Sequence, residues 1–106
     1  MKKVYKIVVF VPEAAADKIR KAMGKAGAGK IGNYSYCSYS TKGIGRFMPL
    51  EGSEPSKGKI GEIEKVAEER IETVCDKEKL DGVINAIKIT HPYEEAPIDL
   101  YEVMIG

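Results

Sequence analysis

The chain has 106 residues, of which 43% are hydrophobic and 31% are charged, and its formal net charge is +1. This length suits a single domain with one core, so we treat residues 1–106 as one domain. The near-neutral charge argues against nucleic-acid binding through bulk electrostatics. No run of about 18 apolar residues exists to cross a membrane, and the charged N-terminal stretch does not fit a signal peptide. We therefore expect a cytoplasmic protein with no membrane or nucleic-acid partner.

The two cysteines, Cys37 and Cys75, are far apart and neither belongs to a CxxC motif. A redox pair or a zinc knuckle is therefore disfavoured, and two reduced thiols are expected.

The first third of the chain predicts a strand followed by a helix. Residues 4–11 are rich in β-branched and aromatic side chains and are apolar on both faces from Ile7 onward, as in a central strand. Pro12 closes the strand and suits the first position of a helix. Apolar residues then recur at helical spacing between Ala15 and Ala26.

The middle of the chain predicts a second strand and a long loop. Residues 33–40 alternate like a half-buried strand, and Thr41 to Gly45 is expected to break it. Residues 46–50 form a short extended piece. Residues 51–61 are rich in Gly, Ser, Pro, Lys and Glu, and a loop of this length is typically functional or mobile.

Residues 61–75 fit two patterns. Their periodicity slightly favours a helix, whereas residues 71–75 are strongly β-prone. Asp76 is a good N-cap for a helix over residues 77–89, which His91-Pro92 ends. Residues 98–103 alternate as a last strand.

The architecture resolves this ambiguity. A helix over residues 61–75 would leave three strands with poorly covered faces, whereas a strand gives the order β-α-β-β-α-β. We therefore predict a ferredoxin-like α+β fold with an antiparallel sheet and both helices on one face.

Several short runs resemble the inserted domain of the Nif-three-like (NGG-interacting factor three) family. The runs are Gly32-Asn33-Tyr34, Tyr36-Cys37, Gly43-Ile44-Gly45-Arg46-Phe47-Met48-Pro49, Glu51-Gly52-Ser53-Glu54-Pro55, Gly58-Lys59-Ile60-Gly61, Arg70-Ile71-Glu72-Thr73-Val74 and His91-Pro92-Tyr93-Glu94-Glu95. That insert is similar to the PII signalling proteins and the CutA proteins, and it also occurs as a stand-alone domain.

The resemblance implies a PII/CutA-like fold and a homo-oligomer, with a trimer favoured and ligands bound between subunits. It also implies that the long loop after the second strand, about residues 42–61, is the functional surface. The dimetal site of full-length members lies outside the insert, and a chain with one histidine cannot supply it.

The segment from His91 to Pro97 is a candidate metal site. It places His91 beside Glu94 and Glu95, and imidazole and carboxylate groups are suitable ligands for a divalent metal ion. The alternative is structural: the imidazole satisfies backbone groups at the helix end, the carboxylates pair with basic residues of the first helix, and Tyr93 packs.

The segment Gly43-Ile44-Gly45-Arg46 is a candidate ligand site. Gly43 and Gly45 could let backbone N–H groups approach an anion that Arg46 clamps, and Tyr93 could add a ligand contact. The segment lacks the ending of a P-loop, and glycines required by turns or bulges are the alternative explanation.

Other chemistries have less support in the sequence. Tyr34, Tyr36 and Tyr39 could stack bases, but they fall on both faces of the expected strand and no RNP pattern accompanies them. Catalysis by Cys37 or Cys75 with His91 would need an adjacency that the sequence does not show.

Two functional hypotheses remain. The leading one is a regulatory domain that binds a small ligand, a metal ion or a protein partner. The alternative is a structural interaction module without a ligand, and a metal-dependent hydrolase ranks below both.

Overall fold

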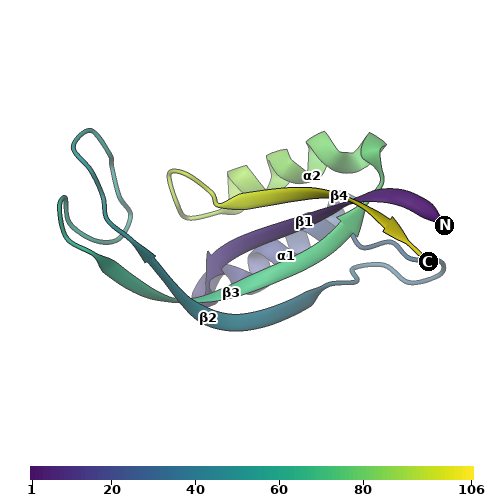
Figure 1. Ribbon diagram of the computed structural model, residues 1–106, viewed down its shortest axis with the longest axis horizontal. Coiled ribbons are helices and arrows are strands. Elements are labelled where there is room, and N and C mark those ends of the chain that lie inside the picture. The colour runs from purple at the N-terminus through teal and green to yellow at the C-terminus, as the bar shows by residue number, and fades with distance from the viewer.

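The computed structural model describes all 106 residues and contains four strands and two α-helices. In chain order these are β1 (Lys2–Pro12), α1 (Ala16–Lys25), β2 (Tyr39–Phe47), β3 (Glu64–Cys75), α2 (Lys77–Thr90) and β4 (Ile98–Ile105), and a short 3₁₀ turn (Glu13–Ala15) leads into α1. Figure 1 shows the sheet in front of α1, with both chain ends at one end of the molecule and the β2–β3 loop at the other.

The four strands form one antiparallel sheet in the order β2-β3-β1-β4. Both helices pack on the same face, because Ile19 and Met23 of α1 share one cluster with Val83 and Ile87 of α2. The predicted β-α-β-β-α-β fold is therefore confirmed.

Strand β1 is the centre of the core. Ile7, Val9 and Val11 point toward the helices and are fully buried, and Val8 on the other face is fully buried as well. Strand β1 is also central within the sheet, because β3 pairs along one of its edges and β4 along the other.

The segment with two possible patterns is a strand. Residues Glu64–Cys75 form β3, which pairs with β1 on one side and β2 on the other. Its buried Ile71 and Cys75 join the core cluster. Tertiary pairing thus overrides the helical periodicity of this stretch.

The second strand lies further along the chain than predicted. Residues Tyr39–Phe47 form β2, whereas the alternating residues 33–38 belong to an irregular connection. The segment from Thr41 to Gly45, which we expected to break the strand, lies inside it and pairs with β3. Prediction failed because Gly43 and Gly45 weaken the local strand pattern, while the ladder with β3 supplies the stability.

Helix α2 begins after Asp76, as predicted, but the Asp76 side chain makes no capping hydrogen bond. Its carboxylate instead pairs with the Lys2 ammonium at 2.8 Å. The helix ends at Thr90, and His91 leaves the helical conformation directly before Pro92, as the proline rule predicts. No helix is both long and apolar enough to cross a membrane.

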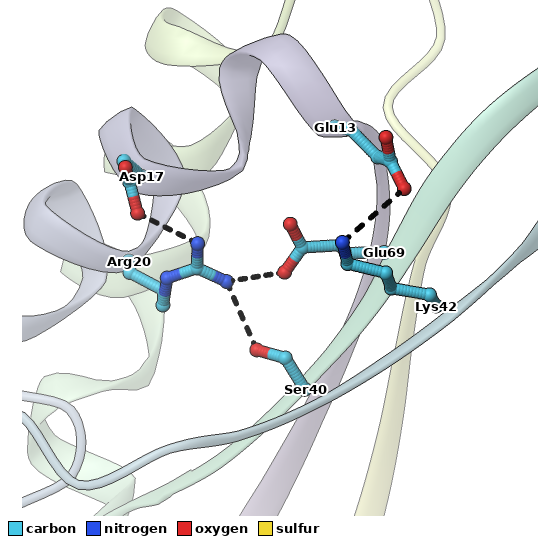
Figure 2. A network of polar contacts seen from close by, with 6 residues as sticks. All are labelled: Glu13, Asp17, Arg20, Ser40, Lys42 and Glu69. Atoms are coloured by element: carbon cyan, nitrogen blue, oxygen red, sulfur yellow. Dashed lines mark hydrogen bonds and ion pairs between the residues drawn. The ribbon is translucent and has the colours of Figure 1, made fainter.

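Arg20 of α1 joins the helix layer to the sheet (Figure 2). Its guanidinium donates to Glu69 Oε1 at 2.6 Å, to Ser40 Oγ at 2.9 Å and to Asp17 Oδ1 at 2.7 Å. Glu69 belongs to β3 and Ser40 to β2, so a single side chain fixes α1 over two strands. The planar guanidinium suits this role because it presents several donors in a rigid arrangement.

Candidate ligand-binding cleft

A cleft of about 810 Å³ is lined in part by the β2–β3 loop and the turn before β4. These two segments lie at the end of the molecule opposite the chain termini (Figure 1). Three parts of the chain line the cleft: β2 with the loop after it, the adjoining part of β3, and the turn from Tyr93 to Pro97. Phe10 of β1 contributes as well. A cleft of this size falls in the range that holds small molecules.

The strand register explains why a cleft forms here. Strand β1 pairs with β3 only from Glu68 to Cys75, whereas β2 pairs with β3 from Glu64 to Glu72. The part of β3 before Glu68 therefore has β2 as its only partner, and the two strands project beyond β1 (Figure 1). The concave region is bounded by this two-stranded extension, its loop and the turn before β4.

Glu68, the first residue of β3 that pairs with β1, is a buried residue in the lining of the cleft. Glu68 is only 7% exposed, and its Oε2 accepts a hydrogen bond from the Tyr93 hydroxyl at 2.8 Å. Burial and the neighbouring Glu68 carboxylate raise the pKa of Tyr93, which keeps the phenol protonated as the donor. The Tyr93 ring also contacts Phe47 edge-on, with ring centroids 5.6 Å apart.

Gly45 gives space to the Glu68 carboxylate. A Cβ at this position would clash with the Glu68 carboxylate. Gly45 has no positive φ, so it is the space taken by the carboxylate, and not the backbone conformation, that requires glycine. Gly43 and Gly45 lie in strand β2 and not in a turn or loop, and both glycines, Arg46 and Tyr93 line one cleft. Anion binding at this segment stays a prediction.

His91 occupies a structural position beneath this site. It is 7% exposed; its Nε2 lies 2.8 Å from the Phe10 carbonyl, and its Nδ1 accepts from the Tyr93 backbone N–H at 3.1 Å. A backbone N–H can only donate, so Nδ1 is the acceptor and Nε2 carries the hydrogen. Burial lowers the pKa of His91, which favours this neutral form.

The structure does not assemble the predicted metal ligands. Both nitrogens of His91 are engaged, and no group of three or more His, Cys, Asp or Glu side chains is arranged to hold a metal ion. Glu94 instead accepts a hydrogen bond from the backbone N–H of Glu54 at 3.1 Å, while Glu95 is exposed on the cleft wall. The contact between Glu94 and Glu54 joins the long loop to the turn before β4.

Four basic side chains line the cleft, and two of them have no ion-pair partner. Arg70 pairs with Glu72 at 3.0 Å and Lys42 with Glu13 at 4.0 Å. Arg46 and Lys57 form no ion pair, and both are exposed. Neither has an ion pair to break on binding an anion, and alternation along β2 places Arg46 on the sheet face opposite Gly45 and Phe47.

Sequence reasoning found the long loop, Arg46 and Tyr93, but it missed Glu68, Phe47 and Phe10. Once residues 64–75 are assigned to a strand, alternation puts Glu68 on the face opposite Ile71. The sequence carried no further signal, because the burial of Glu68 results from Tyr93 and Gly45, which are distant along the chain.

Comparisons with known structures first define the class of protein. The chain superimposes on the periplasmic divalent cation tolerance protein CutA from Archaeoglobus fulgidus with a TM-score of 0.69 and 20% identity, covering 99% of this chain and 87% of that one. At this identity the likeness shows the fold alone. The chain thus has a PII/CutA-like α+β fold, as predicted.

More specific similarity comes from longer proteins. The chain is 50% identical over 97 residues to the GTP cyclohydrolase 1 type 2 homolog of Halalkalibacterium halodurans, covering 92% of this chain and 26% of the relative. The crystal structure of a Bacillus cereus protein related to NIF3 matches with a TM-score of 0.83 and 45% identity, covering 96% of this chain and 26% of that one. No family model matches the chain.

The similarity to the Nif-three-like family that the motifs predicted is confirmed over nearly the whole of this chain. The chain spans about a quarter of the length of these relatives, since it covers 26% of each.

Proposed function

We propose that this chain is a regulatory domain that binds a small ligand in the cleft between the β2–β3 loop and the turn before β4. The observation that carries the proposal is the composition of the cleft. An aromatic and apolar lining surrounds one buried carboxylate, and two basic residues without ion pairs, Arg46 and Lys57, are among the lining residues. Binding sites for small molecules combine a mainly apolar wall with a few polar groups that fix orientation.

Arg46 and Lys57 make an anionic group the first feature expected of the ligand. Neither side chain has an ion-pair partner within the chain, so neither has to break an ion pair to bind an anion. Arg46 can hold two oxygens of a phosphate or carboxylate group at once, whereas Lys57 acts as a point charge on the loop.

The names of the relatives suggest other functions that we do not transfer to this chain. A GTP cyclohydrolase homolog is about four times as long as the matched segment, so its activity belongs to a larger protein. Cation tolerance is attributed to a CutA protein that shares only 20% of its residues with this chain.

The loop that closes the cleft provides the test. Deletion of residues 51–56 removes the backbone N–H of Glu54 that binds Glu94, together with lining residues Ser53 and Pro55. We expect wild type to be stabilised in a thermal-shift screen by at least one anion among nucleotides and inorganic triphosphate, because a ligand of the folded state raises the unfolding temperature. The deletion variant should lose this shift.

Divalent metal ions serve as a comparison set in the same screen. Stabilisation of wild type by none of the anions, or an equal shift in the deletion variant, would contradict binding in this cleft. The chain would then be better explained as an interaction module. That alternative is favoured by exposed apolar side chains on β2 and β4, including Ile44 at 61% and Met104 at 57% exposure.

We also propose that the chain forms a homo-oligomer, with a trimer favoured. Strands β2 and β4 are the two edges of the sheet, and edge strands offer unpaired backbone groups to a second copy. The exposed apolar residues on these edges support the same assembly. Both cysteines are free thiols, which is consistent with the cytoplasmic location that we propose.

A further inference from the structure

We infer that Glu68 makes the floor of the cleft a subsite for a planar group that carries two adjacent N–H donors, such as an amidine, a guanidine or an amino-heterocycle. This inference rests on the proposed ligand-binding function and names the second end of the ligand. Four observations on Glu68 and its surroundings carry it.

Glu68 is a buried charge that no protein cation neutralises. Its residue exposure is 7%, and it is the only acidic residue among the buried ones, yet it takes part in no ion pair. Buried carboxylates are usually paired. Glu69, the next residue, illustrates the usual arrangement, because it lies on the opposite face and pairs with Arg20. An uncompensated buried carboxylate costs free energy unless something supplies donors.

One of the two carboxylate oxygens has no partner in the chain. Oε2 accepts the Tyr93 hydroxyl, whereas no hydrogen bond reaches Oε1. No fully enclosed side-chain nitrogen or oxygen lacks a partner anywhere in the chain, so Oε1 is not sealed inside the protein. Glu68 lines the cleft, and this is the space to which Oε1 opens.

The strand opposite is shaped to admit this carboxylate. A Cβ at Gly45 would clash with Glu68 Oε1 and Cδ, whereas a Cβ at Gly43 would meet no atom within 4 Å. Both glycines lie in β2 and neither has a positive φ. Gly45 therefore leaves room for the carboxylate. Gly82 of α2 provides a control position outside the cleft, because an added Cβ would meet no atom within 4 Å there.

The walls around Glu68 favour a planar ligand group. Phe47 and Tyr93 form an edge-to-face pair, and Phe10, Leu50 and Pro97 continue the apolar lining. Aromatic faces attract flat groups, and more strongly those that carry positive charge. A carboxylate is best matched by two parallel N–H donors in one plane. Together these features select an N–C–N edge over a tetrahedral ammonium.

The test uses benzamidine as the planar probe, with benzoate and benzylamine as comparison probes of opposite charge and of tetrahedral geometry. Binding is measured by calorimetry and by amide shifts in NMR spectra of the whole chain, for wild type, Glu68→Gln, Gly45→Ala and Gly82→Ala. We expect benzamidine to bind wild type and to shift amides around Gly45, Glu68 and Tyr93. Its affinity should fall about tenfold or more in Glu68→Gln and Gly45→Ala, because a hydrogen-bonded charge pair is lost or displaced, and it should be unchanged in Gly82→Ala.

Three results would overturn the inference: equal affinity of benzamidine for Glu68→Gln, tighter binding of benzoate or benzylamine than of benzamidine, or amide shifts confined to residues outside the cleft. The shift mapping needs only wild type, so it decides the matter even if a variant does not fold. Inorganic triphosphate separates this inference from the proposed function. Triphosphate binding without benzamidine binding overturns the subsite alone, whereas failure of both probes overturns the cleft as a ligand site.

Discussion

At the scale of single residues, the contact between Tyr93 and Glu68 links the turn before β4 to the sheet. Tyr93→Phe removes the only hydrogen-bond donor to the Glu68 carboxylate and keeps the ring contact with Phe47. The loss of a donor to a buried charge should lower the free energy of unfolding by roughly 1–3 kcal/mol. Urea denaturation of the variant and wild type would measure this difference.

Tyr101→Phe is the matched control for this prediction. Tyr101 lies on β4, is 49% exposed and donates no hydrogen bond. Its substitution should change stability by less than about 0.5 kcal/mol. Equal costs for the two substitutions would show that the Tyr93 hydroxyl contributes nothing specific.

His91 makes stability depend on pH. Burial lowers the pKa of the imidazole from its ordinary value of 6.5, opposed more weakly by the hydrogen bond to Phe10 and by Glu68. The unfolded chain therefore binds a proton at a higher pH than the folded chain. The stabilising contribution is present above pH 6.5 and is lost as the pH falls toward the lower folded pKa.

The free energy of unfolding should thus decrease as the pH is lowered from 7.5 to 5.5. The contribution of this group to the decrease should be at most about 1.4 kcal/mol per pH unit. His91→Gln should flatten the dependence, because it is the only histidine in the chain. An unchanged slope in His91→Gln would assign the pH dependence to other groups.

At the scale of elements, the connection between α1 and β2 is held by a close backbone approach at Gly29. The N–H of Gly29 donates to the Val74 carbonyl at 2.7 Å, and its carbonyl accepts from Cys37 N–H at 2.9 Å. Thr73 Oγ1 adds a hydrogen bond to the Cys37 carbonyl at 2.8 Å. These contacts attach the connection of residues 26–38 to β3, although this connection contains no helix or strand.

Gly29→Ala should disrupt this attachment. Gly29 has φ +77°, and a Cβ there would overlap the backbone of Cys37, so we expect a cost of more than about 2 kcal/mol. Gly32 has φ +56° and open space around it, so Gly32→Ala should cost only about 1 kcal/mol from backbone strain. Thermal unfolding of both variants separates steric overlap from strain, and equal destabilisation would contradict the proposed close approach.

At the scale of the whole molecule, the shape of the chain supports assembly through its edges. The molecule is elongated, with extents of 46 × 24 × 22 Å, and β4 exposes Leu100 and Met104 along its length. Both side chains are exposed, so replacing them with aspartate should leave the core intact. We expect native mass spectrometry to show a trimer for wild type and a smaller species for the Leu100→Asp/Met104→Asp variant. A monomeric wild type would contradict the proposed assembly.

The sequence by itself determined the elements that a local pattern encodes. The apolar run of β1, the apolar faces of the two helices and the proline after His91 each gave the correct element, and the family motifs pointed to the fold. These features depend on residues close together in the chain, where spacing alone fixes which side chains share a face. The strand at residues 64–75 differs, because its local periodicity slightly favours a helix and only the need to cover every apolar face predicted a strand.

Only the tertiary structure decided the start of β2 and the chemistry of the cleft. Residues 41–45 become a strand because β3 lies beside them, and Glu68 becomes a buried acceptor because Tyr93 and Gly45 enclose it. In the same way, the use of both imidazole nitrogens by Phe10 and Tyr93 made His91 a structural residue. Strand register and loop path depend on pairing between distant segments, and no local pattern records that pairing.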